Sequence, residues 1–531
     1  MNKQDLYNLT RRNDFLWKSG GLLAVIMLVL GTGISFLNTN RLNTFQQIIA
    51  TPIYVDEFDE EFSDMRGETG VDPGMIAAAL VETLSSSEPF HEKLQDISFL
   101  LYYITPESVS QIPVIDKLST NQQAIAVALV AACAEPESED AIKALKMLAS
   151  GDSPAADASY ALALAHENRE DNRAVIKALK REVELHDSVH ARKRLIDTYL
   201  EFKKFDALEG LVRDFNYQEF ISPYVLLDIA LDRMDWPAIL KTHFPASFEG
   251  MRLGMVSLAV LSGLVWATIL IRFSGTVSVL KFVVPALLLG ALSAHATVLF
   301  IYWQEYQLGF SMGADPMSQL IYCILGIGFR EEALKLLLFV PLIPFLLKRD
   351  DLEILTVAGL VGLGFALEEN INYFQASAGL SAVGRFATAN FLHIALTAMC
   401  GLTLTRAIVH RGEDIQHAVT TFLLAVAVHG LYDAFLMVPL LADYSWLTYT
   451  VFVLMGYQYF GWLRHLREKW KDPVSITAIF TYGVILVTGM SFVLYAWDYG
   501  PLPALQSIVY EAIGVGIILV LFYREIPENT V

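Results

Sequence analysis

Long apolar stretches and amphipathic stretches divide the chain into three parts. A first apolar run, Gly21–Leu37, follows a short basic segment at the N-terminus. Between about 41 and 250 no window of 18 apolar residues occurs, and the pattern has the 3.6-residue period of amphipathic helices instead. From 251 onward, runs long enough to cross the roughly 30 Å of a bilayer core follow one another. The pattern therefore predicts an all-α fold, a polytopic transmembrane helix bundle that carries a helical extramembrane domain.

The apolar runs predict ten membrane spans. The first lies within residues 1–40 and is interpreted as an uncleaved signal anchor, because no small-x-small cleavage site follows it. The other nine lie near 251–272, 280–303, 317–347, 353–374, 385–409, 417–438, 445–463, 474–497 and 502–523.

The positive-inside rule predicts the orientation of these spans. A cytoplasmic N-terminus places the basic loops on the cytoplasmic side of a cell membrane, and it places Arg385 in an external loop. The domain of residues 41–250 is then extracytoplasmic, and residues 251–531 form a multi-pass membrane domain.

A weak repeat runs through the second half of the extramembrane domain. Tyr160–Asn172, Arg194–Asp206 and Val225–Trp236 each have the pattern of an apolar helix that ends in a polar turn, at a spacing of roughly 30–34 residues. This period favours stacked helix–turn–helix units of the tetratricopeptide (TPR) kind, which offer a concave surface to a protein partner. The consensus Trp, Gly and Tyr positions are missing, so a generic α-helical domain fits the pattern equally.

Composition and charge narrow the function classes. Of the 531 residues 54% are hydrophobic and only 18% are charged, yet the formal net charge is −19, with most of the excess acid between 41 and 250. Such a chain has no basic patch that displaces phosphate counterions, which excludes nucleic acid as a partner and leaves the lipid bilayer. Its three cysteines, Cys133, Cys323 and Cys400, have no CxxC spacing and exclude a disulfide framework.

Ionisable residues inside the predicted spans are the candidates for chemistry. They occur on four consecutive spans, in the order Arg330, Glu331, Glu332 and Lys335; Glu368 and Glu369; His393; and His429 with Asp433. Each charge that faced lipid would cost roughly 2.5–3.5 kcal/mol. We therefore expect these groups to face inward, at a common depth of about 10–20 Å below the external boundary.

Carboxylates and imidazoles in a wet membrane cavity suit the activation of water against a peptide carbonyl. The sequence has no HExxH motif of a zinc protease, and neither a GxSG nor a GxGD motif. A transporter or channel with a buried Glu/His proton relay uses the same groups, although the inverted repeat expected of many transporters is not visible. An inert membrane scaffold is the third alternative.

Four ordered motifs make residues 317–440 similar to the PrsW family, which belongs to the CAAX-type (ABI) group of intramembrane proteases. They are Phe329-Arg-Glu-Glu-Ala-Leu-Lys335, Gly364-Phe-Ala-Leu-Glu-Glu-Asn370, the isolated His393, and His429-Gly-Leu-Tyr-Asp433. The resemblance implies an intramembrane endopeptidase that cuts a membrane-anchored protein, for example an anti-sigma factor. The extramembrane domain is not part of that resemblance.

The resemblance also implies roles for the site residues. Glu331 or Glu332 would activate water with the help of Glu369 and His393, while His429 and Asp433 would position the substrate or the oxyanion. Supporting contacts would come from Lys335, Phe365 and Asn370. Metal-free chemistry without a cofactor is favoured, and the alternative is zinc bound by Glu332, Glu369, His393 and His429. His295 and Glu511 also lie in mid-span and are interpreted as members of local polar pairs.

Overall fold

A computed structural model describes residues 3–38, 80–103, 118–134, 139–150, 154–466 and 474–526. Every regular element within these ranges is a helix, as the all-α prediction requires. The chain separates into two compact units, Leu42–Glu249 and a membrane unit made of Met1–Arg41 with Gly250–Val531. Residues 39–79 of the predicted anchor and extramembrane domain lie outside the described residues.

Among the described residues of the membrane unit, seven helical segments are long and apolar enough to cross a membrane. They contain α2 (Asn13–Ser35), α14 (Leu253–Ser274), α15 (Leu280–Tyr302), α19 (Asp351–Ala376), α20 (Ala382–Ala387) with α21 (Ala389–Val409), α22 (Ile415–Met437) and α24 (Ile476–Tyr499). An eighth consists of α25 (Pro501–Gly514) and α26 (Gly516–Glu525), which are bent against each other by 53°. A polytopic bundle is therefore supported.

Two of the ten predicted spans do not match such helices. Residues 317–347 form a series of shorter pieces: α16 (Pro316–Ile321), the π-helix η5 (Tyr322–Gly328), α17 (Phe329–Phe339), η6 (Val340–Leu342) and α18 (Ile343–Leu346). Pro341 and Pro344 lie where the regular hydrogen bonding ends, because proline lacks the amide hydrogen. Residues 445–463 correspond to α23 (Leu447–Leu466), whose Tyr, Gln and Gly residues lower its mean hydropathy.

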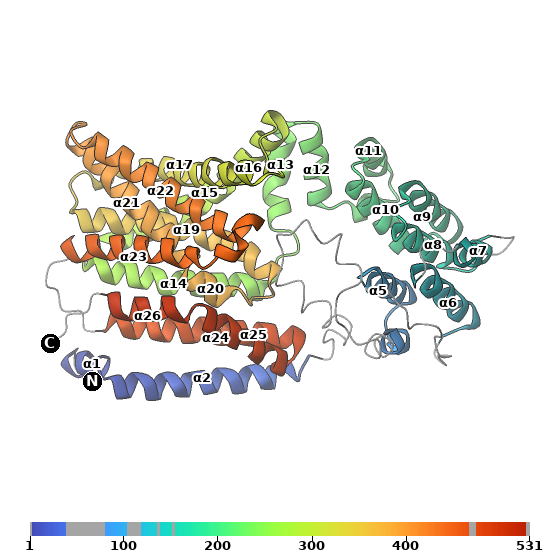
Figure 1. Cartoon of the computed structure of the whole chain (residues 1–531), viewed down its shortest axis with the longest axis horizontal. Coiled ribbons are helices and arrows are strands. Elements are labelled where there is room, and N and C mark those ends of the chain that lie inside the picture. The colour runs from blue at the N-terminus through green and yellow to red at the C-terminus, as the bar shows by residue number, and fades with distance from the viewer. Residues whose placement is uncertain are drawn as a thin grey trace. The chain divides into compact units, whose positions relative to one another are not determined.

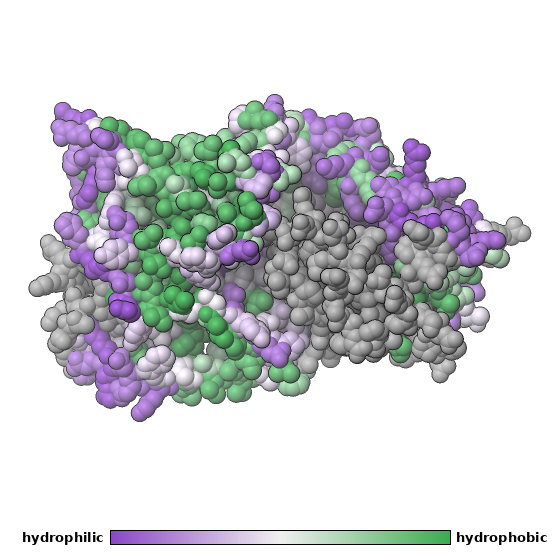
Figure 2. Space-filling model, in the orientation of Figure 1, coloured by the Kyte–Doolittle hydropathy of each residue, from purple (hydrophilic) through white to green (hydrophobic). Residues whose placement is uncertain are grey.

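The helices of the membrane unit lie side by side with roughly parallel axes (Figure 1). Apolar side chains gather over the middle of this bundle, and hydrophilic side chains gather at one end of its helices (Figure 2). Within the bundle α19 and the segment Ala382–Val409 are the most enclosed, with 83% and 78% of their apolar windows buried. Polar side chains on these two segments therefore face protein rather than lipid.

Two glycines of α19 allow these close helix crossings. A Cβ atom at Gly362 would lie 2.2 Å from the carbonyl oxygen of His393 on α21, and one at Gly364 would lie 2.2 Å from the carbonyl oxygen of Leu287 on α15. Only a residue without Cβ lets the backbones approach so closely. The crossing at Gly362 is what brings α21 and its histidine against α19.

The other unit contains a series of helices. Their bounds are α5 (Phe90–Tyr103), α6 (Thr120–Ala134), α7 (Glu139–Leu148), α8 (Ala158–Glu167), α9 (Asn172–His186), α10 (Val189–Glu201), α11 (Phe205–Arg213), η2 (Gln218–Phe220), α12 (Pro223–Asp232) and α13 (Trp236–Ser247). The short elements α1 (Lys3–Leu9), η3 (Val277–Val279), η4 (Trp303–Gln307) and η7 (Pro439–Tyr444) belong to the membrane unit.

Three successive helix pairs, α8–α9, α10–α11 and α12–α13, have the same turn. In each turn one residue has a positive φ, of 58° at Glu170, 50° at Lys203 and 51° at Met234. The backbone N–H of the following residue donates to the carbonyl oxygen five residues before it, at 2.8–3.1 Å. This bond is the one that closes a Schellman-type helix end. The shared turn supports the repeat of helix pairs that the sequence predicts.

Candidate active site

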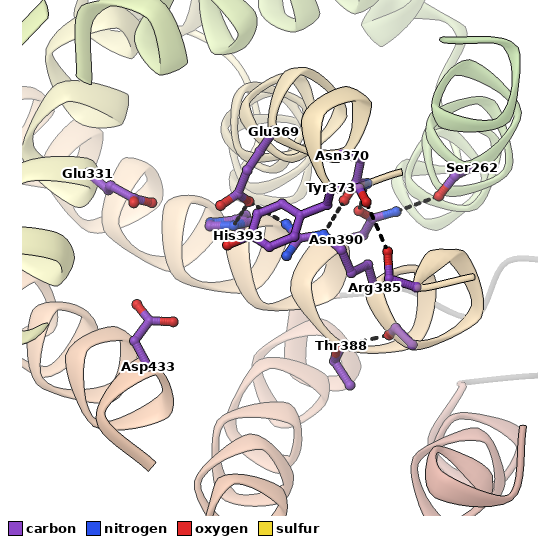
Figure 3. Close-up of polar contacts among 12 residues, drawn as sticks. Ser262, Glu331, Glu369, Asn370, Tyr373, Arg385, Thr388, Asn390, His393 and Asp433 are labelled. Carbon is purple, nitrogen blue, oxygen red and sulfur yellow. Dashed lines mark hydrogen bonds and ion pairs between the residues drawn. The ribbon is translucent and has the colours of Figure 1, made fainter. Parts of the chain in front are cut away.

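Four helices bring the polar residues of the membrane spans into one buried cluster. The contributors are Glu331, Glu332 and Lys335 from α17, Glu369 from α19, His393 from α21, and His429 with Asp433 from α22. The π-helix η5 leads into α17, a feature often found at functional sites. A Cβ atom at Gly328 would lie 2.6 Å from the carbonyl oxygen of Val426, so this glycine lets α17 begin against α22. In Figure 3 the labelled side chains of the cluster point toward a common space.

Glu332 is fully buried and holds two other members of the cluster. Its Oε1 accepts hydrogen bonds from Lys335 Nζ and from His429 Nδ1, both at 2.8 Å. Lys335 Nζ also lies 3.4 Å from Glu331 Oε2 and donates to His393 Nδ1 at 2.7 Å. The charge of this buried ammonium is therefore compensated by two carboxylates on its own helix.

Glu369 is held by Arg385 and His393. Its Oε2 accepts from Arg385 Nη2 at 2.5 Å and from His393 Nε2 at 3.1 Å. The Arg385 guanidinium stacks on the ring of Tyr373, 3.7 Å from the centroid, and its Nε donates to Asn370 Oδ1 at 2.6 Å (Figure 3). Because the guanidinium makes all three contacts, it fixes the orientation of the Glu369 carboxylate.

Arg385 does not lie in the loop that the sequence predicted. The residue lies in α20, and its side chain is only 15% exposed. Asn370, for which a supporting contact was predicted, begins a polar chain in which its Nδ2 donates to Asn390 Oδ1 at 2.6 Å. Sequence reasoning missed the next bond of this chain, from Asn390 Nδ2 to Ser262 Oγ at 2.7 Å. A single arginine at the start of an apolar run, beside a span that carries acids, was the available signal.

The remaining predicted residues lie on the walls of the cluster. Phe365 is buried, with Lys335 Nζ 4.1 Å from its ring centroid and the His393 ring 5.0 Å away. Glu368 does not join the cluster and pairs with His295 at 3.2 Å. His295 is therefore a member of a local polar pair, as expected.

Three side chains lie close enough together to be ligands of one metal ion. The ligand atoms of Glu331, His393 and His429 lie within 4.8 Å of one another, and all three residues are buried. Because Nδ1 of His429 is bonded to Glu332, its Nε2 faces Glu331 Oε2 at 3.6 Å and Asp433 Oδ2 at 3.4 Å. A carboxylate that holds the second nitrogen of a histidine is the usual arrangement at zinc sites.

The cluster also contains acceptors without donors. Glu331 Oε2, Glu332 Oε2 and Asp433 Oδ2 are buried and accept no hydrogen bond from the described residues. Lys335 Nζ lies 3.4 Å from Glu331 Oε2 and supplies charge without a hydrogen bond. Buried carboxylate oxygens without hydrogen bonds are costly. With two imidazoles beside them, the residues present fit a divalent cation such as Zn²⁺. His393 uses both ring nitrogens within the protein, so metal binding by His393 displaces either Lys335 or Glu369.

Residues 278–457 match the model of a protein family described as PrsW family intramembrane metalloprotease. The matched segment contains every residue of the cluster. No curated protein and no solved structure matches the chain.

Proposed function

We propose that this chain, which belongs to the PrsW family of peptidases and is a multi-pass membrane protein, hydrolyses a peptide bond of a membrane-anchored protein at the buried Glu/His cluster. The observation that carries the proposal is the convergence of Glu331, His393 and His429 within 4.8 Å, from three separate helices. Burial of such groups in a membrane bundle is costly, and a catalytic role accounts for it.

Glu331, His393 and His429 would hold a divalent cation, which supplies a more acidic bound water and a Lewis acid for the peptide carbonyl. This set contains Glu331 in place of the Glu332 and Glu369 that the sequence suggested. The carboxylates of Glu332 and Glu369 do not belong to the group of three potential ligands. The unbonded carboxylate oxygens support a cation over the metal-free chemistry that sequence reasoning favoured.

The chain's own residues divide the remaining tasks. Glu369 Oε2 is held by Arg385 and His393, which leaves Oε1 to accept a proton from the attacking water and return it to the leaving amine. Glu332 orients His429 through Nδ1, and Lys335 compensates the carboxylates on α17. These are the roles that a general base and its positioning residues require.

A transmembrane substrate must unwind before it reaches this site, because its carbonyl groups are hidden in i→i−4 bonds. With the predicted topology, the cut falls in the outer half of a single-span substrate or just outside it. The helix pairs of the extracytoplasmic, TPR-like domain would bind the external part of that substrate, and an anti-sigma factor fits this description.

The N-terminal helix remains attached in this proposal. Ser19 Oγ and Tyr482 Oη on α24 lie 2.5 Å apart, and Asn38 Nδ2 donates to the carbonyl oxygen of Trp497 at 2.8 Å. A Cβ atom at Gly489 would lie 2.7 Å from Met27. Contacts along the whole helix support a signal anchor that stays in the folded protein.

Purified full-length protein in proteoliposomes, incubated with single-span membrane peptides, tests the activity. We expect cleavage by the unaltered chain and by Glu413→Gln, a matched control in an exposed loop. The double variant Glu332→Gln, Glu369→Gln should lose cleavage. Because each change removes the anionic partner of a buried cation, its unfolding temperature should also fall, and circular dichroism at the assay temperature checks that the protein is folded. Full activity of a well-folded double variant contradicts the catalytic roles of Glu332 and Glu369. Proton flux without cleavage indicates a transporter or channel with a buried proton relay instead. The topology is tested with Asp206→Cys, which should react with a membrane-impermeant label in intact cells because Asp206 is exposed. Absence of labelling contradicts an extracytoplasmic domain.

A further inference from the structure

A cavity lies beside the Glu/His cluster. It has a volume of about 280 Å³ and is lined by residues of α22, α23 and α25 and by Thr388, Ser445 and Val515. Tyr432 in its wall directly precedes Asp433 of the cluster, and Thr388 follows Arg385 by three residues. The cavity therefore adjoins the site through Tyr432 of α22 and through Thr388, which joins α20 to α21.

A carboxylate in this cavity has no cationic partner. Glu511 Oε1 accepts the backbone N–H of Gly384 at 2.9 Å, and Glu511 forms no ion pair within the described ranges. A Cβ atom at Gly384 would lie 2.3 Å from that oxygen, so the glycine makes room for the carboxylate. The Glu511 side chain is half-buried, and carboxylates removed from water are normally paired. The negative charge of Glu511 is therefore not compensated by a cationic side chain among the described residues.

A broken helix lines the same cavity. The chain bends by 53° between α25 and α26, and the Tyr449 hydroxyl donates to the carbonyl oxygen of Gly514 at this bend, at 3.0 Å. Irregular backbone within a membrane is tolerated where it is buried in protein or lines a polar cavity. The bend, Gly514 and Glu511 all belong to the wall of this cavity, and the bend is an observation independent of the unpaired carboxylate.

We propose that this cavity is a substrate subsite that binds a Lys or Arg side chain close to the cleaved bond. The inference rests on the proposed peptidase function and names a substrate feature. Glu511 accepts a charge-assisted hydrogen bond from the basic side chain. The aromatic rings of Tyr432, Tyr449 and Phe452 pack along its apolar stem and attract its cation. The hydroxyl of Thr388 offers a further acceptor.

Peptides that differ at one position test this subsite. A series of single-span peptides carries Lys, Arg, Gln or Glu at each position in turn around the cleaved bond, and cleavage is measured with full-length protein in proteoliposomes. Binding of the same peptides is measured in the Glu332→Gln, Glu369→Gln background. We expect Lys and Arg to be preferred over Gln by about tenfold at one position, which corresponds to about 1.4 kcal/mol. Glu511→Gln should abolish this ratio, and Glu413→Gln should keep it.

The outcomes separate the two proposals. Cleavage without any preference for a basic residue, or a preference that survives in folded Glu511→Gln protein, overturns the subsite and leaves the peptidase function standing. A binding preference that depends on Glu511, without cleavage by the unaltered chain, supports the subsite and overturns the peptidase function. Absence of both cleavage and selective binding overturns both. Circular dichroism checks that Glu511→Gln is folded, and absence of any basic preference in the unaltered chain overturns the subsite without the variant.

Discussion

The crossing of α19 and α21 at Gly362 sets the position of His393, and Gly362→Ala should displace it. The added Cβ atom would lie 2.2 Å from the His393 carbonyl oxygen and 2.7 Å from its carbonyl carbon. Ordinary contact begins near 3.4 Å, so the two helices must separate by about 1.2 Å at this point. The obstacle is backbone rather than a flexible side chain, so a close-packed interior cannot absorb it by a rotamer change.

This displacement affects both bonds of the His393 ring. Nε2 lies 3.1 Å from Glu369 Oε2 and Nδ1 lies 2.7 Å from Lys335 Nζ, so a shift of about 1 Å breaks at least one of them. A misplacement of this size costs about 10²-fold in rate, and overpacking of a core costs roughly 1–3 kcal/mol in stability. We expect Gly362→Ala to fold with a lower unfolding temperature and to cleave about 10²-fold more slowly.

Gly359→Ala is the matched control, one turn earlier on the same helix. Its Cβ atom would meet Ile394 Cγ2 at 3.4 Å and Ala398 Cβ at 3.5 Å, which are ordinary contacts. Alanine also favours a helix over glycine by about 1 kcal/mol. Cleavage by Gly359→Ala should be normal, and its thermal unfolding temperature equal or higher. Normal cleavage by Gly362→Ala, or an equal loss in both variants, would refute the reasoning.

Three further predictions follow from the contacts. Arg385→Met should lower cleavage about 10²-fold, and Arg385→Lys should recover only part of that loss. Lysine lacks the planar guanidinium that contacts the Glu369 carboxylate, the Asn370 amide and the Tyr373 ring together. Equal activity of the two variants would contradict this role. Glu332→Gln should weaken zinc binding by about 10–100-fold, because His429 loses its carboxylate partner. Elemental analysis of the purified protein should therefore show a lower zinc content. An unchanged zinc content in folded protein counts against metal binding by His429. Burial raises the pKa of Asp96 to about 6 from 3.8. The folded state thus holds this proton more tightly, and the stability of α5 should fall as pH rises from about 4 to 6. Asp96→Asn should remove that fall in amide hydrogen exchange of the intact protein, and persistence of the fall refutes the assignment.

Several features of this protein could be predicted from the order of its residues. Apolar runs of bilayer length define most of the spans, and the cost of a charge in lipid requires Glu331, Glu369, His393 and His429 to meet in the interior. That requirement is a free-energy argument which needs no coordinates. The turn pattern of the helix pairs is likewise local, because each helix end is closed by bonds within six residues.

Which atoms meet was decided only by the tertiary structure. Consecutive residues on a helix point about 100° apart, so the sequence alone could not tell that Glu331 joins the two histidines while Glu332 supports one of them. It also could not tell that Arg385 turns inward from a short helix. These choices depend on the angles and contact points at which helices cross, and those are set by small residues such as Gly362 that act across long sequence separations. The period of a helix determines which residues share a face, and the crossings determine what that face meets.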